Sequence, residues 1–415
     1  MIALIADILI IGSVLLGHVW ALVAILHHVH SARLRLVTIA SLTYLTEAVF
    51  WLAVVGWGWW FFRHDFSVLD YARTGQFNLW QWSYLVFFAT LGSVAVPLWV
   101  ARRLSAAPPQ QQRARRRRTH DVASALGHWP LEPGRNAMIA RLPGNQAMKI
   151  DIVELTLEIP RLHPALDQLS LVHLSDIHFN RAFRQSYFEE VVRITNLLDA
   201  DLITITGDVV DDKPCVPWIP ETLGKLSAEL GVYVIFGNHD WLLGDLSLIR
   251  DAVDAAGLHY LGGNWTTINA QGQDIVLAGN ELPWVRPAAD PAELPPRDAS
   301  GSPLRVLLAH APDQFDWARR HDFDLMLAGH THGGQVALPR LGPVFTASRT
   351  GTAYSSGTFF RDPTVLHVSR GVSGSCPLRY NCPPEITKIT LCCPESKRGK
   401  TEKRSQAALD LFQVV

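Results

Sequence analysis

Long apolar runs occupy the first hundred residues of the chain, and shorter apolar runs separated by polar segments occupy the rest. Three of the long runs reach the length of a bilayer-spanning helix, because about 20 residues cross a hydrocarbon core of about 30 Å. They cover Ile2–Leu26, Leu36–Phe62 and Trp82–Val100. The pattern therefore predicts three transmembrane helices, and the alternative is three buried helices of a soluble domain.

Basic residues are distributed unevenly around these three runs. Arg33 and Arg35 lie between the first two, and Arg102, Arg103 and the run Arg113–Arg118 follow the third. Basic loops stay in the cytoplasm, so we expect an inner-membrane protein whose remaining residues lie on the cytoplasmic side. The arginine run contains no aromatic residue and directly follows a membrane span, which favours a positive-inside anchor at the lipid bilayer over a site for anionic headgroups or nucleic acid.

The overall composition adds little, because a net charge of −1 conceals this local basic block. The five cysteines are odd in number and irregularly spaced, which argues against a disulfide framework. Cys376 and Cys382 are not at a usual zinc spacing, so reduced thiols are favoured over a structural zinc site.

Beyond residue 148, short apolar runs alternate with segments of helical spacing, which is typical of an α/β domain with a partly parallel sheet. Later hairpins favour a mixed sheet or two packed sheets. The expected strands are 149–159, 169–175, 201–206, 232–236, 275–279, 305–309, 325–328, 365–368 and 385–391. The expected helices are 184–199, 220–230 and 246–256.

These patterns predict four regions. Residues 1–104 hold the transmembrane helices, 105–148 a basic juxtamembrane linker, 149–393 the α/β domain, and 394–415 a charged tail that we expect to be disordered. Within the domain, the proline-rich stretch 281–302 is a long loop that either caps a site or makes a surface excursion.

Polar side chains follow five of the predicted strands at the point where each strand ends. They are Asp176 and His178, Asp208 and Asp211, Asn238 with His239 and Asp240, His310, and His330 with His332. The carboxyl ends of parallel strands meet at one edge of a sheet, so these side chains are expected to lie together. Gly207, Gly237 and Gly329 precede three of the groups and allow a tight turn.

This set of side chains is too large for one tetrahedral metal. A lone strand histidine is usually a satisfied core residue, but five groups in the same structural position favour a metal site. Carboxylate, amide and imidazole ligands suit two ions about 3.5–4 Å apart that share one carboxylate. Manganese, iron and zinc all fit such ligands.

The motifs Asp-x-His, Gly-Asp-x-x-Asp, Gly-Asn-His-Asp, His before Ala-Pro, and Gly-His-Thr-His resemble the calcineurin-like metallophosphoesterase family. The resemblance covers about Leu171 to Leu391. The membrane anchor and the stretch PLRYNCPPEI are similar to a membrane-associated bacterial branch, which includes relatives of UDP-2,3-diacylglucosamine pyrophosphatases. The resemblance implies a four-layer αββα sandwich, preceded here by the transmembrane segment, and a dinuclear metal site.

The resemblance also implies a role for each site residue. The first ion would be held by Asp176, His178, Asp208 and His332. The second would be held by Asp208, Asn238, His310 and His330, with Asp208 bridging. His239 would lie beside the site without binding a metal and would protonate the leaving oxygen or stabilise the phosphoryl charge, and Asp211 would orient His239. Asp240 stands where the family sometimes has glutamate.

Arg370 and Arg379 flank a glycine-rich stretch, and each either grips a second substrate phosphate or is a surface arginine. The expected function is hydrolysis of a phosphoester or pyrophosphate bond in a phosphorylated small molecule or lipid near the membrane, such as UDP-2,3-diacylglucosamine. One alternative is a broad-specificity phosphodiesterase that is tethered to the membrane. Another is a non-catalytic membrane regulator that keeps the fold, which the complete set of ligands disfavours.

Overall fold

A computed structural model of the chain describes residues 2–64, 67–298 and 302–394. The predicted charged tail therefore lies outside the described residues, except for residue 394. The chain divides into two compact units. The membrane unit contains Met1–Ala107 together with Leu338–Gly351, and the α/β unit contains Pro108–Ala337 and resumes at Thr352.

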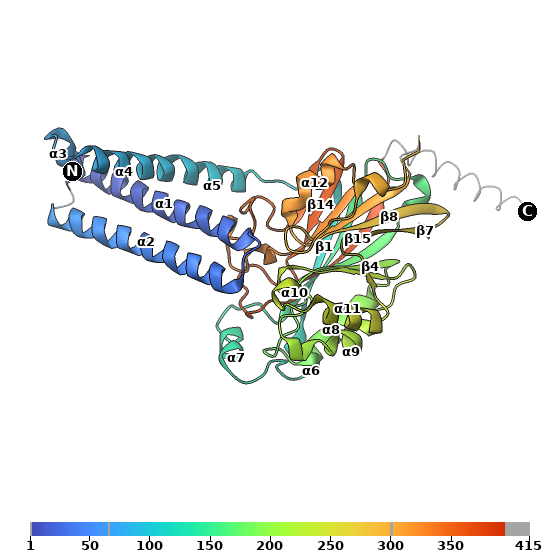
Figure 1. Cartoon of the computed structure of the whole chain (residues 1–415). Coiled ribbons are helices and arrows are strands. Elements are labelled where there is room, and N and C mark those ends of the chain that lie inside the picture. Colours follow the sequence, from blue (N-terminus) through green and yellow to red (C-terminus); the bar gives the residue numbers. More distant parts are fainter. Residues whose placement is uncertain (1, 65–66, 299–301, 395–415) are drawn as a thin grey trace, which may run out of the picture. The chain divides into compact units, whose positions relative to one another are not determined.

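The membrane unit is built on three helices that are long and apolar enough to cross a membrane, as predicted. The first two are α1 (Ile2–Ser31) and α2 (Leu36–Arg63), and the third runs through α4 (Leu79–Thr90), a π-helical turn η1 (Leu91–Ala95) and α5 (Val96–Leu104). The short helix α3 (Val68–Arg73) lies between the second and third. Figure 1 shows α1, α2 and α4 lying side by side.

Small residues explain the close crossing of α1 and the third span. A Cβ atom on Gly17 would collide with the backbone of Phe88, and one on Gly92 would collide with the backbone of Ser13. Glycine at both positions lets the two helix backbones approach each other directly, as is common where helices associate in lipid.

The α/β unit contains two large sheets, and Figure 1 labels β1, β15 and β4 of one sheet and β14, β8 and β7 of the other. The seven-stranded sheet has the order β1 (Gln112–Asp121), β2 (Lys149–Glu158), β15 (Glu385–Cys392), β3 (Ser170–Leu174), β4 (Leu202–Thr206), β5 (Val232–Ile235) and β6 (His259–Tyr260). The six-stranded sheet has the order β13 (Gly357–Arg361), β14 (Thr364–Val368), β10 (Leu325–Ala328), β9 (Leu304–Ala309), β8 (Gln273–Asn280) and β7 (Trp265–Ala270). Strands β3 to β6 are parallel to one another, and so are β8, β9, β10 and β14.

Apolar side chains point alternately to the two faces of each sheet. One face packs against the other sheet, and the outer face packs against helices. In β9, Val306 and Leu308 lie in the core between the sheets, whereas Leu307 points into the core on the other side. This period of two is the strand repeat, and burial on both faces explains why the strands are continuously apolar. The result is the four-layer αββα arrangement that the resemblance implied.

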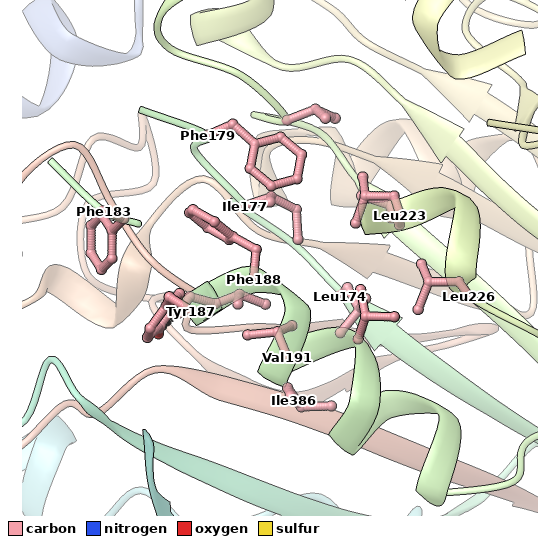
Figure 2. Packing of buried hydrophobic residues seen from close by; sticks show 14 of the residues in the cluster. Leu174, Ile177, Phe179, Phe183, Tyr187, Phe188, Val191, Leu223, Leu226 and Ile386 are labelled. Carbon is pink, nitrogen blue, oxygen red and sulfur yellow. Dashed lines mark hydrogen bonds between the residues drawn. The ribbon is translucent and has the colours of Figure 1, made fainter. Parts of the chain in front are cut away.

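The outer face of the first sheet is covered by α8 (Gln185–Leu197), α9 (Trp218–Thr222) and α11 (Leu246–Ala255), and that of the second by α12 (Phe315–Arg320). Figure 2 shows part of the first of these cores, where Phe188 of α8 packs against Phe179. The two ring centroids are 4.6 Å apart and the rings meet edge to face.

The structure corrects two of the predictions. The region 105–148 is not a linker, because the arginine run forms β1, which pairs along its length with β2 and belongs to the α/β unit. Helix 220–230 is also shorter than expected: α9 is followed by a 3₁₀ turn η4 that ends at Lys225. Strand β1 has too few apolar residues to be seen in a hydrophobic pattern, because most of its side chains are exposed.

Candidate metal centre

The five strand ends bring their polar side chains to one place, but from two sheets rather than from one edge of a single sheet: β3, β4 and β5 belong to the seven-stranded sheet, and β9 and β10 to the six-stranded sheet. Asp176 and His178 follow β3, Asp208 follows β4, and Asn238 begins helix α10 (Asn238–Leu242) directly after β5. His310 follows β9, and the pair His330 and His332 follows β10. Six of these seven side chains have donor atoms in two groups that are compact enough to hold a metal ion.

The first group contains Asp176, His178, Asp208 and His332. The Nε2 atoms of His178 and His332 are 3.1 Å apart. His332 Nε2 is 3.5 Å from Asp176 Oδ1, and His178 Nε2 is 3.6 Å from Asp208 Oδ2. Two carboxylates and two imidazoles converging at these distances form a donor set that fits manganese, iron or zinc.

The second group contains Asp208, His310 and His330. His310 Nε2 lies 3.2 Å from Asp208 Oδ2, 3.2 Å from His330 Nδ1 and 3.0 Å from Asn238 Oδ1. The amide oxygen of Asn238 therefore completes this second donor set. Asp208 is the only described residue that belongs to both of these groups.

Electrostatics in the second group favour a positive charge. Burial by itself lowers the pKa of His310, but the neighbouring Asp208 carboxylate outweighs burial and raises this pKa to about 9. Burial would likewise raise the pKa of Asp208, yet His310 and His239 hold it well below its usual range. A pocket that stabilises an anionic carboxylate beside imidazole nitrogens is suited to a bound cation.

The backbone is strained where it delivers these ligands. Asp176, His178, Asp208, His330 and His332 all have positive φ, between 48° and 68°. Non-glycine residues rarely adopt this conformation, and it recurs at functional sites where the surrounding structure enforces it. The strain aims the side chains inward immediately after each strand.

All three glycines predicted to permit close approach do so by leaving space for ligands, and a Cβ atom on Gly207 would lie 2.5 Å from His310 Nδ1. A Cβ atom on Gly237 would collide with the Asp208 side chain, and one on Gly329 would collide with Ser175 and Asp176. Any larger residue would displace a donor oxygen of the first group.

Hydrogen bonds fix the imidazole tautomers. His178 Nδ1 donates to Asp211 Oδ1 over 2.7 Å, and His310 Nδ1 donates to the carbonyl oxygen of Thr206 over 2.7 Å. In each ring, Nε2 then faces the donor group. Such outer contacts orient metal-binding histidines.

His239 lies beside the first group and belongs to neither of these two donor sets, although its donor atom, with those of Asp211 and His178, forms a third compact group. Its Nδ1 is 3.0 Å from Asp211 Oδ1, and its side chain remains 32% exposed, so a substrate can reach the ring. Burial lowers the pKa of His239, but Asp208 and Asp211 outweigh burial and raise it to about 10. The imidazole is therefore protonated at neutral pH, as a general acid requires.

Asp211 accepts hydrogen bonds from more residues than predicted. Its Oδ1 accepts from both His178 and His239, and its Oδ2 accepts from Ser375 Oγ over 2.7 Å. Burial would raise the pKa of Asp211, but His178 and His239 lower it, so the carboxylate is ionised. Sequence reasoning missed Ser375, since an isolated serine in a loop carries no pattern.

Asp240 ties two ligand loops together. Its carboxylate accepts from the backbone amides of Val209, Val210 and Gly237, at distances between 2.8 and 3.1 Å. This cross-link connects the loop of Asp208 to the start of α10. The shorter side chain, which is a departure from the glutamate sometimes found in the family, is therefore part of the scaffold.

Trp284, at the start of the loop 281–302, forms the wall behind the second group. Its indole ring lies 4.8 Å from the ring of His330 and 5.4 Å from that of His310, and it is almost fully buried. Further along the loop, Arg297 binds Asp322 and Asp324. The first residues of the loop 281–302 therefore support the metal centre, whereas the later residues that the structure describes do not contact it.

The structure contradicts the prediction that Arg370 and Arg379 bind the substrate. Arg370 is buried and forms ion pairs with Asp151 and Glu385. Arg379 is 1% exposed and donates to three backbone carbonyls, and one of its terminal nitrogens lies 3.1 Å from His332 Nδ1. Neither guanidinium is accessible to a substrate, because both are buried. These protein partners compensate the buried charges.

Comparisons with known proteins agree with this geometry. The calcineurin-like phosphoesterase family matches residues 169–334. The chain is 30% identical over 254 residues to the uncharacterized metallophosphoesterase YkuE of Bacillus subtilis, covering 58% of this chain and 85% of that protein. It is 31% identical over 225 residues to the phosphodiesterase YaeI of Escherichia coli, covering 53% and 81%.

A third relative carries a membrane label. The transmembrane protein with metallophosphoesterase domain of Bos taurus is 30% identical over 255 residues, covering 57% of this chain and 56% of that protein. Taken with the fold and the two donor groups, these matches show that the chain belongs to the calcineurin-like metallophosphoesterase family. It is accordingly a phosphohydrolase with a candidate metal centre, and its apolar helices associate it with a membrane.

Proposed function

We propose that this chain hydrolyses a phosphoester or pyrophosphate bond in a membrane-proximal or lipid-linked substrate of the UDP-2,3-diacylglucosamine type. We further propose that it works at the cytoplasmic face of the inner membrane with two manganese, iron or zinc ions. The observation that carries the proposal is the pair of donor groups that share Asp208, in a chain that also holds three helices long and apolar enough to cross a membrane. Tethering raises the local concentration of a substrate that resides in the same membrane.

The residues divide the work of the reaction. Asp176, His178, Asp208 and His332 would hold one ion, and Asp208, Asn238, His310 and His330 the other. Bound ions supply the positive charge that neutralises the phosphoryl oxygens and acidifies the attacking water. The remaining catalysis depends on positioning, since phosphoryl transfer needs little covalent help.

His239 is the group that handles the leaving oxygen. Its ring is partly exposed and is fixed by Asp211, and its raised pKa favours the protonated form, so it can donate a proton as the phosphorus–oxygen bond breaks. The proton then returns from solvent. Asp211 remains ionised throughout and keeps the ring in one orientation.

The second candidate is a broad-specificity phosphodiesterase for which the anchor provides only placement. The match to a protein named as a phosphodiesterase supports this candidate. Both candidates use the same metal centre and differ only in the substrate that the surrounding surface selects.

The discriminating experiment uses the full chain in lipid nanodiscs, supplied in turn with manganese, iron and zinc. We expect hydrolysis of UDP-2,3-diacylglucosamine to exceed that of a chromogenic phosphodiester. Cleavage of the diester alone would reject the lipid-linked substrate and favour the second candidate. Metal binding without hydrolysis of any substrate would indicate a non-catalytic regulator. Protection of the α/β unit from protease added outside intact spheroplasts tests the cytoplasmic placement.

A further inference from the structure

A segment that is separated in sequence from the transmembrane helices joins the membrane unit. Leu338–Gly351 follows the last histidine motif along the chain, yet it clusters with α1, α2 and α5. His27 Nδ1 in the last turns of α1 donates to the carbonyl oxygen of Thr346 over 2.7 Å. The His27 ring also stacks on Phe345 with centroids 5.3 Å apart. These contacts attach the segment to the end of the first span.

The segment also meets the end of the third span. A Cβ atom on Gly342 would lie 3.9 Å from the guanidinium carbon of Arg103 in α5. Gly342 belongs to the two-residue strand β12 (Gly342–Pro343), which pairs with β11 (Ala337–Leu338). Arg340 occupies the turn between these strands, with a φ of 64° and an exposed side chain. The hairpin therefore presents Arg340 to the surroundings of the unit.

Positive charge within the membrane unit is concentrated at the end where α1 and α5 finish. The segments 24–46, 96–107 and 338–351 contain no aspartate or glutamate. Their arginines are Arg33, Arg35, Arg102, Arg103, Arg340 and Arg349, and we call this set the arginine collar. The acidic residues that the structure describes in this unit are Asp7 and Asp70, towards the opposite end of the helices, and Glu47 inside α2.

We propose that the arginine collar binds the anionic headgroups of membrane phospholipids, with Leu338–Gly351 completing the binding site. The inference rests on the membrane placement in the proposed function and adds a ligand to it. Arginine pairs with phosphate oxygens through two parallel hydrogen bonds. A group of cations at the end of membrane spans is also attracted to an anionic leaflet.

Apolar side chains in the same segment fit this location. Leu338 and Val344 are 45% and 37% exposed, on either side of the exposed Arg340. In water, exposed aliphatic groups beside arginine gain no free energy from burial. At a bilayer surface they face acyl chains, while the guanidinium groups face the phosphates.

The chain connection gives this binding site a route to the catalytic unit. Leu338 lies only six residues after His332. Immediately before the segment, Ala337 N donates to the carbonyl oxygen of Tyr380 over 2.9 Å. Just after it, the carbonyl oxygen of Ser355 accepts from Thr331 Oγ1 over 2.7 Å. Thr331 lies in the turn between the two metal-centre histidines. The segment that follows the Gly-His-Thr-His motif is therefore joined on both sides to residues that are hydrogen-bonded within the α/β unit.

The test measures lipid binding rather than hydrolysis. The full chain is placed in nanodiscs of phosphatidylcholine with phosphatidylglycerol, and the lipids retained on the released protein are counted by native mass spectrometry. We expect phosphatidylglycerol to be enriched over its bulk fraction. The double variant R340Q/R349Q should lower this enrichment about threefold or more, whereas R340K/R349K should keep most of it.

The matched control is R63Q/R73Q, which removes two cations at the opposite end of the spans. This control should retain the enrichment, and moderate salt should weaken binding in the unmodified chain. Unchanged enrichment in R340Q/R349Q, or an equal loss in R63Q/R73Q, would overturn the inference. Failure of the unmodified chain to enter nanodiscs would instead reject the membrane placement itself.

Discussion

The two halves of the candidate metal centre are supported in different ways. In the first half, His178 donates to the ionised carboxylate of Asp211, while Arg379 contacts the outer nitrogen of His332. In the second half, His310 donates to a neutral carbonyl, and an indole ring packs against both histidines. A carboxylate partner makes an imidazole a more basic ligand than a carbonyl partner does. The first half therefore depends on charge, and the second depends on packing.

The largest effect is expected from the residue that both halves share. Asp208→Ala should reduce turnover at least about a hundredfold, because it removes a ligand from both ions. Metal content per chain, measured by mass spectrometry, should fall in both halves. Turnover equal to that of the unmodified chain would contradict the assignment of Asp208 as the shared ligand.

His239→Ala tests the general acid, which belongs to neither half. Turnover should fall about a hundredfold, since proton donation to the leaving oxygen is lost. Metal content should remain unchanged, and this separates the variant from Asp208→Ala. A substrate with a highly acidic leaving group should recover much of the rate, because such a group departs without a proton.

Asp211→Asn should affect the first half alone and change the pH profile. The pKa of His239 is raised to about 10 partly by Asp211, so the ring loses its proton only as pH rises through that value. Without the carboxylate this pKa falls, and the alkaline limb of turnover should move to lower pH. Affinity of the first half for metal should drop about tenfold or more. A profile unchanged in shape would reject the pairing of Asp211 with His239.

Trp284→Ala should affect the second half alone. Loss of the indole ring removes the packing behind His310 and His330, and we expect metal affinity there to weaken about tenfold. Metal titration should show one tight and one weakened ion. Trp317→Ala, a tryptophan that packs in the outer core of the second sheet, is the matched control and should leave both affinities unchanged.

The smallest effect is expected from Ser375→Ala. Its hydroxyl donates to the Asp211 oxygen that does not contact an imidazole. Turnover should fall about twofold, in line with the modest net value of one exposed hydrogen bond. A loss as large as that of Asp211→Asn would show that Ser375 has a more direct role.

The metal centre was largely predictable because its ligands follow apolar strands, and the strand ends within each parallel portion share one edge. The sequence did not reveal that β3, β4 and β5 belong to one sheet and β9 and β10 to a second sheet packed against it. The pattern could not reveal that Arg379 supports His332 from within the protein, because a charged residue reads as exposed until its partners are known. Sequence also could not assign Leu338–Gly351 to the membrane unit, because no periodicity records a contact between His27 and Thr346. Strand β1 was missed for the same reason, since pairing with β2 rather than apolar content defines it.

That strand has a further consequence for a crowded membrane. Strand β1 is one margin of the seven-stranded sheet, and its outward backbone amides and carbonyls would otherwise invite a strand from a neighbouring molecule. Any approaching copy would bring the same row of guanidinium groups, so like charges would repel at the contact. Proteins confined to a surface meet one another often, and the charge along this margin disfavours edge-to-edge pairing of their sheets.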